Sequence, residues 1–209
     1  MKIISFDVDG TLVDSSFADL VWLEGVPRLY AEQYHIDINE ARQIITTEYD
    51  GIGEEDVRWY KLDYWFSRFN LKGSYKDLLD KYKDRIVIYE DVFQVLDNLS
   101  KKYTLIVASN AHRDFLSLSL SNIKSYFDHV FSATSDFGEA GKYEWFYTKI
   151  LQYMKVNPSD MVHVGDHYTF DYEIPSKLGI HAFYLDRKMG KGLKNLKEFE
   201  EKVKELERL

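Results

Sequence analysis

Two carboxylates one residue apart, Asp7 and Asp9, directly follow a short apolar run near the start of the chain, residues 3–6. The run predicts a buried strand, and a strand that ends in acids places them at the sheet edge where open α/β folds bind ligands. Asp also favours ordinary turns, so the pair alone does not establish a site. Burying two negative charges together is nevertheless unfavourable unless a cation or a shared proton offsets them. This stretch therefore predicts a metal site at the end of the first strand.

Polar side chains also follow the later predicted strands, at the points where those strands end. Ser109 and Asn110 follow a strand over 103–108, and Asp166 follows a strand over 161–164. Lys142 follows a glycine-containing loop after a third strand, and Asp171 lies five residues beyond Asp166. Ser109 and Asn110 could instead cap a helix, and a lone lysine is a surface residue by default. Because the ends of parallel strands share one edge, however, we expect the four acids, Lys142 and the hydroxyl of Ser109 to surround one crevice.

Apolar periodicity predicts strands that alternate with helices over most of the chain. The strands are expected at 1–6, 103–108, 129–133, 161–164 and 181–185, and the helices at 91–101, 113–126, 144–154, 172–178 and 193–206. Such alternation favours an α/β fold with a doubly wound parallel sheet. Residues 15–87 interrupt it with helical, aromatic segments. We therefore predict a doubly wound core from residues 1–14 and 88–209, with residues 15–87 inserted as a helical domain.

Apolar residues over 57–69 predict one long helix with a wide apolar face inside this insertion. The aromatic residues Trp59, Tyr60, Tyr64 and Trp65 are expected mainly in the core of the inserted domain, with some lining a pocket. In the core domain, His163 lies in the middle of the fourth predicted strand. That position favours a buried core histidine over a ligand.

The composition limits the partners that the chain can bind. Of 209 residues, 45% are hydrophobic and 30% are charged, which is typical of a globular protein. The formal net charge, 27 − 35 = −8, disfavours nucleic acid and anionic membranes, so an anionic substrate needs local positive charge. There is no cysteine, no signal-peptide pattern and no apolar run long enough to cross a bilayer. We therefore expect a cytoplasmic monomer or homodimer with no nucleic-acid or membrane partner.

Four motifs together resemble those of the haloacid dehalogenase (HAD) superfamily. They are FDVDGTLVD at 6–14, ASN at 108–110, the lysine at 142 after a glycine-containing loop, and VGDHYTFD at 164–171. The resemblance covers nearly the whole chain, and the helical insertion has the position of the family's C1-type cap. It implies a Rossmann-like catalytic core and an activity like that of the phosphatases of the superfamily, of the phosphoglycolate phosphatase type.

The resemblance implies a role for each acidic residue. Asp7 matches the family's nucleophile, which attacks a phosphoryl group and forms an aspartyl-phosphate, and Asp9 matches the general acid/base. Asp166 matches a ligand of Mg²⁺, to which Asp7 and the backbone carbonyl of Asp9 also contribute. Asp171 matches the second acid of its motif, which supports the metal or the lysine. The implied cofactor is therefore Mg²⁺.

The other matched positions concern the substrate. Ser109 matches the residue that hydrogen-bonds the phosphoryl oxygens, and Lys142 matches the lysine that balances the charges of nucleophile and phosphate. Thr11 and Asn110, in the same two motifs as the acids and the serine, are further candidates for substrate contacts. The implied substrate is a small phosphorylated metabolite, such as a phosphoglycolate, a sugar phosphate or a nucleotide.

Other activities on a similar fold stay open. Dehalogenases of the superfamily keep the nucleophile but lack an acid two residues later, so Asp9 favours a phosphatase. A phosphotransferase or mutase would pass the phosphoryl group to a second hydroxyl instead of water. A non-enzymatic phospho-acceptor domain, similar to a response-regulator receiver, would not explain the large insertion. Tyr143, His167 and Phe170 depart from the residues usual beside the motifs, and none of these departures removes a catalytic group.

Overall fold

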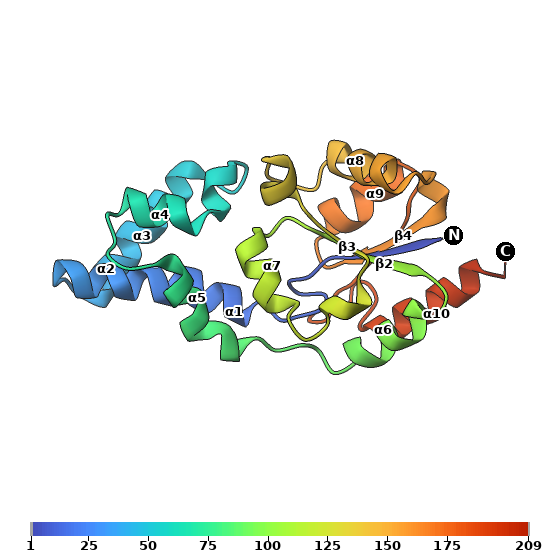
Figure 1. Cartoon of the computed structure of the whole chain (residues 1–209), viewed down its shortest axis with the longest axis horizontal. Coiled ribbons are helices and arrows are strands. Elements are labelled where there is room, and N and C mark those ends of the chain that lie inside the picture. The colour runs from blue at the N-terminus through green and yellow to red at the C-terminus, as the bar shows by residue number, and fades with distance from the viewer. Residues whose placement is uncertain (1, 209) are drawn as a thin grey trace.

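Five strands form one parallel sheet in the larger part of the molecule (Figure 1). The structure, a computed structural model, describes residues 2–208. The strands are β1 (Ile3–Phe6), β2 (Thr104–Ser109), β3 (His129–Ser132), β4 (Met161–Gly165) and β5 (His181–Tyr184). Their order across the sheet is β3-β2-β1-β4-β5. The end of β1 therefore lies between the ends of β2 and β4, which brings the predicted polar residues toward one another.

Helices cover both faces of the sheet because the side chains of each strand alternate between two apolar cores. In β2, Leu105 and Val107 pack into one core, and Ile106 and Ala108 pack into the other. The first core is closed by α6 (Val92–Ser100), α7 (Arg113–Ser119) and α10 (Leu196–Leu206), and the second by α8 (Glu144–Met154) and α9 (Ile174–Lys177). This arrangement confirms the predicted doubly wound α/β fold.

An all-helical part lies beside the sheet and is formed by the chain between β1 and α6 (Figure 1). Its helices are α1 (Ser16–Asp19), α2 (Val26–Tyr34), α3 (Ile38–Ile52), α4 (Leu62–Arg68) and α5 (Tyr75–Tyr82), with a π-helical turn at Leu20–Gly25 and 3₁₀ turns at Val57–Tyr60 and Lys83–Arg85. A third apolar core surrounds the fully buried Trp65. The predicted helical insertion is thus present, and no helix within residues 2–208 is both long and apolar enough to span a membrane.

The chain enters and leaves the helical part at one place. Val13 forms an antiparallel bridge with Ile88, and the backbone N–H of Asp14 donates to the carbonyl of Val87 at 3.0 Å. The two connecting segments are therefore hydrogen-bonded to each other. Beyond these connections, Phe115 of α7 packs into the core of the helical part.

The single helix expected over 57–69 is wrong. The chain forms a 3₁₀ turn at Val57–Tyr60, passes through Lys61 in an extended conformation (φ −106°, ψ 106°), and begins α4 at Leu62. The indole N–H of Trp65 donates to the carbonyl of Trp59 at 3.0 Å, which ties the turn to the new helix. After this break Trp59 is only half-buried and packs at the edge of the core around Trp65.

Candidate active site

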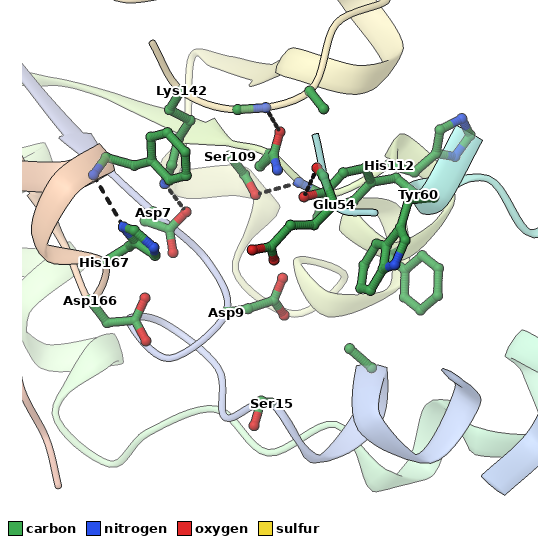
Figure 2. Close-up of a pocket in the computed structure, with 18 of the residues that line it drawn as sticks. Asp7, Asp9, Ser15, Glu54, Tyr60, Ser109, His112, Lys142, Asp166 and His167 are labelled. Carbon is green, nitrogen blue, oxygen red and sulfur yellow. Dashed lines mark hydrogen bonds and ion pairs between the residues drawn. The ribbon is translucent and has the colours of Figure 1, made fainter. Parts of the chain in front are cut away.

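A cavity of about 390 Å³ lies at the carboxyl ends of β1, β2 and β4 and is lined by residues of both the sheet and the helical part (Figure 2). This volume suits a small molecule. The predicted acids Asp7, Asp9, Asp166 and Asp171 all line the cavity, as does Lys142. The topology therefore brings together side chains that are far apart in the sequence.

Lys142 pairs with two buried carboxylates at the base of the cavity. Its ammonium lies 2.5 Å from Asp7 Oδ1 and 2.5 Å from Asp171 Oδ1, and all three side chains are buried. Burial raises the pKa of Asp7 well above its ordinary value, although Lys142 opposes this. Burial alone would lower the pKa of Lys142, but the charges of Asp171 and Asp7 outweigh it and raise that pKa. The lysine is therefore a fixed positive charge beside Asp7.

Asp171 is held by hydrogen bonds on both of its carboxylate oxygens. The backbone N–H of His167 donates to Oδ2 at 3.0 Å, and the buried ring of His163 lies with Nε2 3.0 Å from Oδ1. The other ring nitrogen of His163 lies 2.9 Å from Ser5 Oγ. Burial would raise the pKa of Asp171, but Lys142 and His163 together lower it. His163 is thus a core histidine, as expected, and it also fixes the acid that orients Lys142.

Asp9 and Asp166 occupy more accessible positions than Asp7. Both carboxylates line the cavity together with Asp7 (Figure 2). Burial raises the pKa of Asp9 to about 6, and the negative charge of Asp166 adds to this effect. Burial also raises the pKa of Asp166, as does the charge of Asp171. A neutral, proton-carrying form of Asp9 is therefore accessible near neutral pH.

The acidic residues fit a hard divalent cation. Carboxylate oxygens of Asp7, Asp166 and Asp171 lie within 4.8 Å of one another. Oxygen ligands of this kind suit Mg²⁺. The hydrogen bonds to Asp171 occupy its oxygens, so Asp7 and Asp166 are the better candidates for ligands. With Asp9, four carboxyl groups face one lysine, and this excess of negative charge is a further reason for a cation to bind here.

Gly10 allows Asp166 to approach the first acidic loop. Its φ of +77° lies in the left-handed region, and a Cβ at this position would lie 2.0 Å from Asp166 Oδ2. The glycine therefore leaves the space that the carboxylate fills.

Gly10→Ala is expected to displace Asp166 and to weaken Mg²⁺ binding by about 10-fold or more, measured by titration calorimetry. Gly73→Ala is the matched control, because Gly73 also has a positive φ (+91°) but would place its Cβ in open space. Equal Mg²⁺ affinities in the two variants would contradict the role given to Asp166.

Of the candidate substrate residues, Ser109 and Asn110 line the cavity, whereas Thr11 does not. Ser109 lines the cavity, and its hydroxyl accepts a hydrogen bond from the backbone N–H of Ala111 at 3.1 Å. Asn110 also lines the cavity, and its Oδ1 accepts from the backbone N–H of Gly141 at 2.8 Å, which fixes the loop before Lys142. Thr11 is fully buried outside the cavity lining, and its hydroxyl has no hydrogen-bond partner. The structure therefore does not place Thr11 where a substrate could reach it.

Several cavity residues come from the helical part, and the sequence predicted only that some of its aromatic residues would line a pocket, without identifying which. Trp22 and Glu54 line the cavity, as do Trp59 and Tyr60 from the 3₁₀ turn. Trp22 stacks on Phe115 of α7 with ring centroids 5.5 Å apart. Only the folding of the helical part over the strand ends brings these residues to the site, so motif spacing could not reveal them.

Comparison with known proteins places the chain in a family. Residues 1–179 match the haloacid dehalogenase-like hydrolases. The GMP/IMP nucleotidase YrfG of Escherichia coli (strain K12) is 25% identical over 138 residues, which are 65% of this chain and 60% of the nucleotidase. The match thus spans less than two thirds of the length of this relative.

Solved structures share the fold over nearly the whole chain. A HAD phosphatase from Thermococcus onnurineus has a TM-score of 0.85 at 23% identity, covering 97% of this chain and 98% of that protein. A 2-haloacid dehalogenase from Pseudomonas syringae pv. Tomato DC3000 has a TM-score of 0.70 at 21% identity and 99% coverage of both chains. The HAD-hydrolase YfnB from Bacillus subtilis, bound to magnesium, has a TM-score of 0.67 at 16% identity, covering 97% and 98%. Phosphatase and dehalogenase share this fold, so the chemistry has to be argued from the site residues.

Proposed function

The chain belongs to the haloacid dehalogenase-like hydrolase family, and we propose that it is a Mg²⁺-dependent phosphatase of small phosphate monoesters. The observation that carries this proposal is the acid Asp9, which lines the same cavity as Asp7 and its partner Lys142. Hydrolysis of a phosphate ester needs an acid for the leaving oxygen, whereas displacement of a halide needs none. The nucleotidase YrfG supports a phosphorylated substrate and makes purine nucleoside monophosphates candidates.

In the proposed first step, Asp7 attacks the phosphorus atom. One carboxylate oxygen accepts from Lys142, which favours the ionised form, and the other is available to form the new O–P bond. As the bond from phosphorus to the leaving oxygen breaks, Asp9 gives its proton to that oxygen. The product is an aspartyl-phosphate on Asp7, and the alcohol leaves.

In the proposed second step, Asp9 takes a proton from a water molecule that attacks the phosphorus. The O–P bond to Asp7 breaks, inorganic phosphate leaves, and both acids regain their starting forms. Ser109 lines the cavity at the end of β2, where its hydroxyl can donate to a phosphoryl oxygen. Mg²⁺, held by Asp7, Asp166 and the backbone carbonyl of Asp9, would supply further positive charge for the phosphoryl oxygens.

We further propose that residues 15–87 act as a cap and that residues 1–14 and 88–209 form the catalytic core. The helical part contributes Trp22, Trp59 and Tyr60 to the cavity. A cap that closes over the strand ends excludes water and strengthens the electrostatic interactions inside. Because the side chains of the cap surround the leaving group, they are the ones that can select the substrate.

Metal dependence is the direct test of this function. Phosphate release is measured from p-nitrophenyl phosphate, GMP, IMP and sugar phosphates, with Mg²⁺ and after chelation. We expect chelation to lower turnover by at least about 100-fold and added Mg²⁺ to restore it. Halide release from a 2-haloacid without Mg²⁺ would identify a dehalogenase instead. Phosphorylation of the protein once, without turnover, would identify a phospho-acceptor domain, and transfer to a second hydroxyl would identify a phosphotransferase.

A further inference from the structure

The cavity has little positive charge to offer a substrate beyond the phosphoryl group. Of the lysines and arginines in residues 2–208, Lys142 alone lines the cavity, and it is already paired with Asp7 and Asp171. Arg58, in the turn of the helical part, pairs with Asp56 at 2.6 Å and does not line the cavity. Two histidines, His112 and His167, also line the cavity. A second anionic group on the substrate would therefore find no lysine or arginine beyond Lys142 as a counter-charge.

The helical part instead contributes acidic side chains to the cavity lining, namely Asp19, Glu54 and Glu55. Figure 2 shows the side chain of Glu54 pointing into the cavity, on the side where Asp9 lies. The phenolic O–H of Tyr60 donates to the backbone carbonyl of Glu54 at 3.0 Å and ties this residue to the 3₁₀ turn. The side-chain carboxylate of Glu54 is itself exposed to the cavity, where it can accept hydrogen bonds from a ligand.

Aromatic side chains form another part of the cavity wall. Trp22 and Trp59 line the cavity together with Phe115, and the centroids of the two tryptophan rings lie 5.9 Å apart. Aromatic faces attract cations and apolar surfaces, and they give no stabilisation to an anion. The aromatic wall and the Glu54 carboxylate therefore both disfavour a negatively charged leaving group.

We infer that Glu54 is a specificity-determining residue that selects phosphate monoesters whose leaving group carries hydrogen-bond donors and no negative charge. This inference rests on the proposed phosphatase function. Hydroxyl and ammonium groups of the leaving group donate to the Glu54 carboxylate, and a carboxylate or a second phosphate is repelled by it. Phosphoglycolate, which the sequence resemblance suggested as a substrate, carries such a carboxylate and is excluded by this selection.

Three esters of two-carbon alcohols isolate the charge of the leaving group: aminoethyl, hydroxyethyl and carboxymethyl phosphate. We expect the wild-type kcat/KM for the carboxymethyl ester to be at least about 10-fold below that for the other two. In Glu54→Gln this ratio is expected to approach one, and in Glu54→Lys the carboxymethyl ester is expected to become the preferred substrate. Glu40→Gln is the control, because Glu40 is an exposed glutamate of α3 outside the cavity lining, and its ratios stay those of the wild type.

The outcomes separate this inference from the proposed function. If p-nitrophenyl phosphate is hydrolysed but the wild type does not discriminate against the carboxymethyl ester, the selection by Glu54 is wrong and the phosphatase function stands. The same holds if Glu54→Gln keeps the wild-type ratio while its thermal unfolding is unchanged. If no ester is hydrolysed, including p-nitrophenyl phosphate, both are wrong.

Discussion

Replacing Asp7 by asparagine is expected to lower phosphate release by at least about 10⁴-fold under saturating Mg²⁺, because the amide oxygen carries no charge and cannot form the covalent intermediate. The substitution keeps the shape of the side chain. Lys142 keeps Asp171 as a partner, so the buried lysine is not left without a counter-charge. Initial rates of phosphate release measure the effect, and circular dichroism with thermal unfolding shows that the variant is folded.

Asp128→Asn provides the matched control for this loss. Asp128 is exposed and lies outside the cavity lining, so the same change of chemistry there leaves turnover as in the wild type. A folded Asp7→Asn protein that kept more than about 1% of wild-type turnover would show that another group attacks the phosphorus.

Lys142→Met is expected to affect stability as well as turnover. The lysine is buried between Asp7 and Asp171, and removing it leaves two carboxylates close together without their counter-charge. Breaking a buried ion pair in this way costs about 3–5 kcal/mol of unfolding free energy. Phosphate release is expected to be lost as well, since no other lysine or arginine of residues 2–208 lines the cavity.

The loss of unfolding free energy in Lys142→Met is expected to grow as the pH rises. In the wild type, Lys142 lowers the pKa of Asp171, so that carboxylate is ionised and stabilising throughout the neutral range. In the variant, the pKa values of Asp7 and Asp171 rise, and the folded protein takes up protons as the pH falls. The difference in unfolding free energy from the wild type should therefore be larger at pH 8 than at pH 5. Lys197→Met, a change at an exposed lysine of α10, is expected to show neither effect. An equal loss at both pH values would contradict this account.

The sequence predicted the position of an acidic side chain best where that residue directly follows an apolar strand. Asp7 and Asp166 each follow a buried apolar run, and the parallel pairing of β1 with β4 explains why they meet. Strand ends of this kind can be predicted because a parallel sheet fixes which ends share an edge. Motif position alone does not identify a substrate contact, since Thr11 belongs to the same motif as Asp7 but is fully buried and does not line the cavity.

The sequence did not predict which side chains of the helical part line the cavity and which lie in its core. Trp59 and Trp65 both belong to the apolar residues that predict one helix over 57–69. The extended residue Lys61 lies between them, so Trp59 lines the cavity and Trp65 is fully buried in the core. Glu54 is an acidic residue in a polar stretch, and nothing in its neighbours distinguishes it from a solvated one. Such assignments depend on tertiary packing between segments, which local pattern does not encode.

The central position of β1 has a consequence for how the chain folds during synthesis. Ile3 pairs with Thr104 on one side and Met161 on the other, so the first strand leaves the ribosome long before either neighbouring strand exists. The helices α1 to α5 all precede β2 in the chain, so the helical part can begin to fold before β2 is made, and Phe115 of α7 joins its core later. Its folding holds Val13 beside Ile88, which removes most of the loop that must close when β1 meets β2. The insertion that covers the cavity in the finished protein thus also shortens the conformational search that builds the sheet.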